Sequence, residues 1–103
     1  MRERVRVIAS GKLINPGEVI YELYEKICNE REAIKKEINA SILKEIGNLF
    51  RKNDSYVSKW IVKGLYRKEE AKGENKEAIR NTIVKQVKPL NINEKTVDEY
   101  LNG

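Results

Sequence analysis

Apolar side chains recur every three to four residues along most of the chain, a spacing that predicts amphipathic helices. The segment Asn15-Pro16-Gly17-Glu18 is typical of a helix start, because asparagine caps a helix and proline fits its first position. Glu18, three residues after the cap, is placed to reach back to it. The pattern predicts helices at 16–28, 30–39 (separate from the first or merged with it), 41–50, 54–63, 77–87 and 96–101.

Two segments depart from the helical pattern. Residues 4–9 alternate polar and apolar side chains, which predicts a short strand. Gly64 is expected to end the helix before it, and residues 65–76 then favour a loop over a small β-hairpin wing because their alternation is poor. The expected fold is mainly all-α, with five to six short helices, a helix-turn-helix, and a short N-terminal strand or small wing.

The stretch from Ile46 to Ile61 has the outline of a helix-turn-helix. Its apolar contacts are expected at Ile46, Phe50, Val57 and Trp60. Gly47 is the small residue where two helices would cross, and Asn53 is placed to cap the second helix. Arg51 and Lys52 stand where such turns usually have a glycine and an apolar residue. Because a left-handed backbone at an arginine costs roughly 1 kcal/mol, we expect a longer turn.

The length of 103 residues and the apolar content of 40% fit a single helical domain, 1–103. We divide it into a basic arm or strand at 1–15, a helical segment at 16–40 and a helix-turn-helix core at 41–103. The expected buried residues are Leu23, Ile27, Ile46, Phe50, Val57, Ile61, Ile83 and Leu101. Trp60 and Ile61 are adjacent, so one of them should be partly exposed. An apolar stripe that would serve a homodimer consists of Val19, Leu23, Ile27 and Ile34.

Composition argues against several function classes. The chain has one cysteine, Cys28, and no histidine, which excludes an internal disulfide, a zinc site of Cys and His ligands, and histidine-based catalysis. It also lacks a glycine-rich phosphate loop, so we expect no enzyme activity, cofactor or metal. There is no run of 18 apolar residues and no signal-peptide pattern at the N-terminus, which favours a cytoplasmic protein without a membrane partner.

The net charge of +5 is unevenly distributed. Residues 51–72 hold seven basic and three acidic side chains, and residues 1–12 hold four basic side chains and one acidic. This excess on the helix-turn-helix segment and on the N-terminal arm favours double-stranded DNA as the partner. The residues expected to face base edges are Ser55, Tyr56 and Lys59. Those expected to meet phosphates are Lys52, Lys63, Arg67 and Lys68. Asn53 caps the helix and is also expected to touch the DNA backbone.

Residues 41–103 resemble the phage-repressor and Cro-like helix-turn-helix family. Residues 57–61, followed by Gly64, look like its recognition helix and the glycine that ends it. Residues 79–87 look like its fourth helix, and residues 90–93 leading to 98–101 look like its closing helix. The resemblance implies sequence-specific DNA binding, in transcription regulation or in plasmid or phage replication or partition.

Two alternatives remain open. A strand at residues 4–9 followed by helices is the order of a ribbon-helix-helix dimer, in which paired strands enter the major groove. The amphipathic helices also fit a protein–protein interaction module or an accessory helical domain of a replication enzyme.

Overall fold

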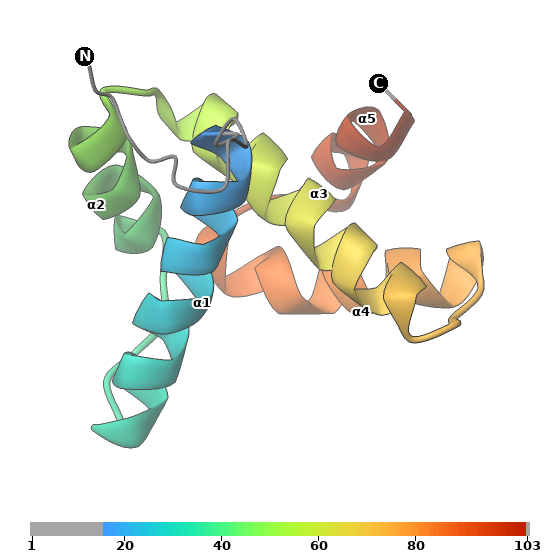
Figure 1. Ribbon diagram of the computed structural model, residues 1–103, viewed down its shortest axis with the longest axis horizontal. Coiled ribbons are helices and arrows are strands. Elements are labelled where there is room, and N and C mark those ends of the chain that lie inside the picture. The colour runs from blue at the N-terminus through green and yellow to red at the C-terminus, as the bar shows by residue number, and fades with distance from the viewer. Residues whose placement is uncertain (1–15, 103) are drawn as a thin grey trace, which may run out of the picture.

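The computed structural model describes residues 16–102, and all of the regular structure in that range is helical (Figure 1). The predicted mainly all-α fold is confirmed, while the strand expected at residues 4–9 lies outside the described residues. Among the helices at residues 16–102, none combines the length and the hydropathy that a membrane span requires. The elements are α1 (Pro16–Ala33), α2 (Ser41–Phe50), α3 (Asp54–Ala71), α4 (Lys76–Val87), the 3-10 helix η2 (Lys88–Leu90) and α5 (Glu94–Asn102).

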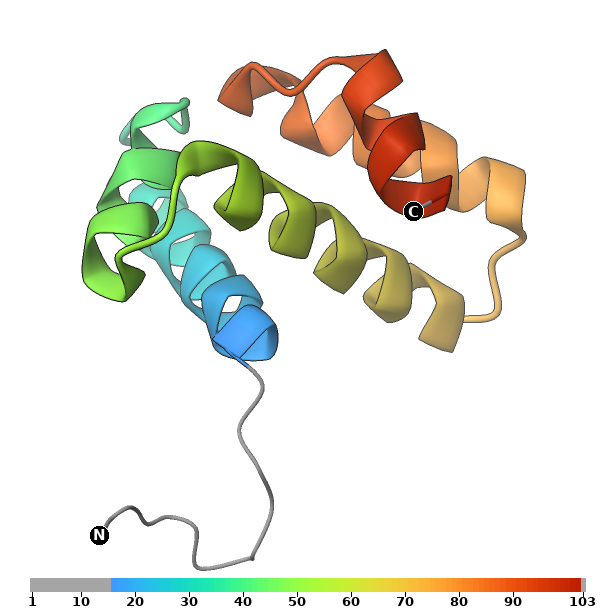
Figure 2. The same ribbon diagram turned by 90° about the horizontal axis from the view of Figure 1, so that it is seen from above.

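The central element is α3, which contacts each of the other four α-helices. Figure 2 shows α1 on one side of α3, with α4 and α5 on the other. A core of buried apolar side chains from all of these helices surrounds α3, and burying each such side chain contributes about 1.5–3 kcal/mol. The completely buried large side chains are Ile20, Ile42, Ile46, Val57, Ile61, Val62, Ile79, Ile83, Val87, Leu90 and Val97.

The core prediction is confirmed in part. Ile46, Val57, Ile61 and Ile83 are completely buried. Leu23, Ile27, Phe50 and Leu101 are only partly buried and pack around the edge of the core. On α1 the prediction differs from the structure by a rotation of the helix, because the side that meets the core carries Ile20 and Tyr24. Trp60 is partly buried beside the completely buried Ile61, as their adjacency predicted.

The prediction of a separate helix at 30–39 is wrong, and the merged alternative is confirmed only as far as Ala33. α1 runs without a break to Ala33, and residues 34–40 then form a connection. The helix ends where Lys35 adopts a left-handed backbone, with φ of 57°. The next amide, of Lys36, donates to the carbonyl of Arg31 at 2.7 Å and closes the helix end. Ile34 therefore leaves the apolar side of α1 and is 70% exposed, which shortens the predicted stripe.

Arg31 holds this connection in place. Its side chain is buried and donates to the carbonyl of Glu37 at 3.3 Å and to the hydroxyl of Ser41 at 3.4 Å. It also forms an ion pair with the carboxylate of Glu45 on α2. A buried guanidinium requires such partners, so this one side chain links the end of α1 to α2.

The prediction that Gly64 ends its helix is wrong, because α3 continues to Ala71. Gly64 lies where α1 crosses α3, and a Cβ there would be 2.2 Å from Cγ of Tyr21. The crossing has a second such contact, since a Cβ at Gly17 would be 2.1 Å from Cδ2 of Trp60. Each helix thus places an aromatic ring against a glycine of the other, which allows close packing.

The loop or wing expected at residues 65–76 is wrong for the same reason, since residues 65–71 belong to α3. The chain reverses at Gly73, whose φ of 85° is readily adopted only by glycine. In the following helix the prediction is confirmed: α4 ends at Val87, and Pro89 lies in the short helix η2.

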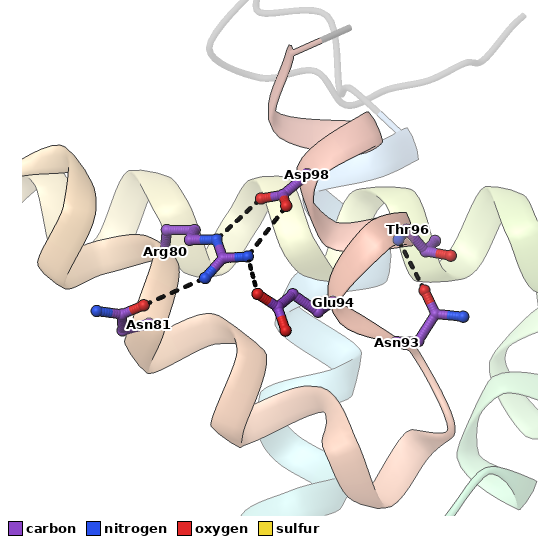
Figure 3. Close-up of polar contacts among 6 residues, drawn as sticks. All are labelled: Arg80, Asn81, Asn93, Glu94, Thr96 and Asp98. Carbon is purple, nitrogen blue, oxygen red and sulfur yellow. Dashed lines mark hydrogen bonds and ion pairs between the residues drawn. The ribbon is translucent and has the colours of Figure 1, made fainter.

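Arg80 links α4 to α5 (Figure 3). Its guanidinium makes two hydrogen bonds to the carboxylate of Asp98, at 2.9 and 3.0 Å, and also pairs with Glu94. Asn93 caps α5 by accepting a hydrogen bond from the Thr96 amide at 2.8 Å. The two-pronged contact is the strong form of an arginine–carboxylate pair, so it orients α5 on α4.

This contact predicts a pH-dependent stability. The hydrogen bonds from Arg80 lower the pKa of Asp98 below its ordinary value of 3.8. The pKa of Asp98 is lower in the folded state than in the unfolded state. The contact therefore stabilises the fold at pH values above the ordinary pKa, and this stabilisation is lost as the pH falls through the folded-state pKa. We expect Asp98→Asn to be less stable than the native protein at about pH 6, with a smaller difference at about pH 2.5. Urea unfolding at both pH values measures this, and an equal difference at both would contradict it.

Candidate nucleic-acid interface

The connection between α2 and α3 is the short turn 51–53, so the longer turn expected from the sequence is wrong. Arg51 adopts the left-handed conformation, with φ of 55° and ψ of 45°. The amide of Lys52 donates to the carbonyl of Gly47 at 2.9 Å, which satisfies the end of α2. A Cβ at position 47 would lie 2.6 Å from the Lys52 carbonyl oxygen, so glycine makes room for the turn.

Asn53 caps α3, as predicted. Its side-chain oxygen accepts a hydrogen bond from the amide of Tyr56 at 2.8 Å, while the backbone at Asn53 is extended. This bond satisfies one of the amides that the first turn of a helix leaves without a carbonyl partner. The cap therefore sets where α3 begins.

One side of α3 carries basic and aromatic residues away from the core. Tyr56, Lys59 and Lys63 follow at intervals of three and four residues, which places them along one side of the helix. Lys52 joins them from the turn, with its Nζ 4.7 Å from the centroid of the Tyr56 ring. Among the described residues, Lys52, Lys59 and Lys63 form no ion pair with a carboxylate. We call Lys52, Tyr56, Lys59 and Lys63 the basic stripe.

Arg67 and Lys68 differ from the basic stripe because each has an acidic partner on α1. Arg67 Nη1 lies 3.1 Å from an oxygen of Glu18, and Lys68 Nζ lies 2.8 Å from an oxygen of Glu25. The hydrogen bond to Glu25 raises the pKa of Lys68. Lys68 is nine residues after Lys59, about two and a half helical turns, and so projects from the opposite side of α3. The structure thus separates Lys68 from the other expected contact residues.

Trp60 and Tyr100 border the basic stripe, and neither was among the expected contact residues. Trp60 lies on the α1 side, with Lys63 Nζ 5.7 Å and Arg67 Cζ 5.9 Å from its ring centroid. The helical spacing of Trp60, Lys63 and Arg67 already indicates this grouping. Tyr100 lies on the α5 side, where its hydroxyl donates to the carbonyl of the exposed Ser55 at 3.3 Å. No local sequence signal indicates Tyr100, because it comes from a distant helix.

Comparison with known protein families, curated proteins and solved structures found no match to this chain. Within residues 16–102, no group of three or more Asp, Glu or Cys side chains is placed to hold a metal ion. Functional inference therefore rests on the arrangement of side chains around α3.

Proposed function

We propose that the protein binds double-stranded DNA by placing the exposed side of α3 in the major groove. The observation that carries this proposal is that Lys52, Lys59 and Lys63 have no carboxylate partner among the described residues and lie along one side of α3. The basic residues farther along this helix, by contrast, are paired with glutamates. Free cationic groups displace the counterions around phosphates, which is the main sequence-independent source of DNA affinity.

The length of the basic stripe suits this role. Tyr56 and Lys63 are seven residues apart within α3, or about 10 Å at the rise of a helix, and Lys52 lies beyond Tyr56 in the turn. The major groove is about 12 Å wide, so the ends of the stripe would reach the phosphate backbones that border it. Ser55, Tyr56 and Lys59 lie between those ends and would face base edges.

We further propose that two copies act together in a sequence-specific regulator, or in a factor for plasmid or phage replication or partition. One recognition helix contacts only a few base pairs, and pairing doubles the contacts. Sedimentation on and off DNA tests this part: a monomer in both conditions contradicts it.

A fluorescence-anisotropy titration with random duplex DNA at two salt concentrations tests DNA binding. Phosphate contacts by Lys52 and Lys63 imply a log–log salt slope of about −1.8 for the native protein. Replacing Lys52, Lys59 and Lys63 by alanine should weaken binding at low salt by about tenfold or more and flatten the slope. The matched control replaces the exposed Lys85, Lys88 and Lys95 by alanine. Both variants lower the net charge from +5 by three, to +2, so only a localised contact surface distinguishes them.

Each other outcome contradicts the proposal in a different way. Equal weakening in both variants would mean that net charge alone drives binding. Undiminished binding by the variant lacking the three stripe lysines would move the contact to Arg2, Arg4 and Arg6 and favour the ribbon-helix-helix alternative. Absence of binding by the native protein at low salt would leave the protein–protein interaction module. An unchanged helical circular-dichroism signal must accompany each variant.

A further inference from the structure

A hollow of about 250 Å³ lies where α3, the start of α4 and the end of α5 meet. Its lining residues are Lys63, Tyr66, Arg67, Lys76, Tyr100 and Leu101. Three of these six side chains are cationic, and none is a carboxylate. Four other hollows in the described part of the chain each include at least one glutamate in their lining. This hollow is therefore the one among them whose charge suits an anion.

Two of the three cations are held near each other by Trp60. The Nζ of Lys63 and the Cζ of Arg67 lie 5.7 and 5.9 Å from the centroid of its ring. Arg67 also pairs with Glu18, but both side chains are more than half exposed, at 57% and 60%. An ion pair this exposed stabilises little, so an anion in the hollow competes for the guanidinium at small cost.

The third cation, Lys76, comes from the other wall of the hollow and is the first residue of α4. The amino-terminal end of a helix carries partial positive charge, which adds to that of the lysine. The Asn75 side chain satisfies the amide of Ala78 at 2.8 Å, so the cap leaves the amides of the first two helical residues without a carbonyl partner. The phenol of Tyr66, also on the wall, supplies a neutral hydrogen-bond donor.

We infer that this hollow binds a phosphate group. It is smaller than the roughly 300–1,000 Å³ typical of sites for drug-sized ligands, which favours a small anionic group over a large apolar one. The phosphate belongs either to the DNA backbone, in which case the inference rests on the proposed function, or to a free phosphate-bearing molecule. Because Lys63 is shared with the basic stripe, a backbone phosphate here would extend the DNA contact from α3 to α4 and α5.

The first test is an NMR titration of ¹⁵N-labelled full-length protein with inorganic phosphate at constant ionic strength. We expect saturable amide shifts around residues 63–67, 76–78 and 100–102. Lys76→Gln should weaken this binding at least fivefold, while Lys85→Gln, an exposed change on the same helix outside the hollow, should not. Absence of saturable shifts in the native protein overturns the inference. Equal phosphate binding by Lys76→Gln also overturns it, because Lys76 would then only offset the negative end of α5.

The second arm identifies the source of the phosphate through the salt dependence of DNA binding. If the hollow holds a backbone phosphate, Lys76→Gln should flatten the log–log slope by about 0.9 relative to the native protein and to Lys85→Gln. Saturable phosphate binding with an unchanged slope assigns the hollow to a free ligand. If DNA does not bind but phosphate does, the proposed function fails while the phosphate site stands.

Discussion

Replacing Gly64 by valine should destabilise the protein by about 1–3 kcal/mol or more, although glycine is a poor helix former. The new Cβ would lie 2.2 Å from Cγ and 2.8 Å from Cβ of Tyr21. Cβ of Tyr21 is fixed by the α1 backbone, so turning the ring away removes the contact with Cγ but leaves the one with Cβ. The expected result is a lower urea midpoint with an unchanged slope.

The same substitution in a Tyr21→Ala background separates packing from helix propensity. With the ring removed, only the 2.8 Å contact with the Cβ of residue 21 remains, so Gly64→Val should cost less than it does in the native protein. The difference between the two costs is the coupling energy of the contact between these positions. An equal cost in both backgrounds would mean that α1 does not lie against Gly64.

Replacing Ile61 by alanine should cost about 2–5 kcal/mol, the largest effect expected from a single substitution here. Ile61 is completely buried on α3, the helix that contacts all the others, so the cavity left behind has packed neighbours on all sides. Leu49→Ala is the control, because Leu49 is 70% exposed on α2 and should change the stability by no more than about 0.5 kcal/mol. Similar urea midpoints for the two variants would contradict the central position of α3.

The sequence predicts only the part of the candidate site that lies on one helix. The spacing of Tyr56, Lys59 and Lys63 follows from helical geometry, and the Asn53 cap that starts the helix is local chemistry. The sequence could not predict the contribution of Tyr100, because α5 meets the first turn of α3 only in the folded chain. The sequence also does not show which basic residues have a carboxylate partner, because the partners of Arg67 and Lys68 lie on α1.

The sequence by itself determined the all-α character, the start of α3 and the end of α4, because periodicity, caps and proline act within a few residues. The tertiary structure decided the length of α3. The local sequence favours a helix end at Gly64, but in the fold this glycine lies where the Tyr21 ring packs as α1 crosses α3. The tertiary structure also decided the left-handed turn at Arg51, whose local cost is offset by the packing of α2 against α3, where Gly47 lies beside Val57. These outcomes depend on contacts between distant segments, which no local pattern contains.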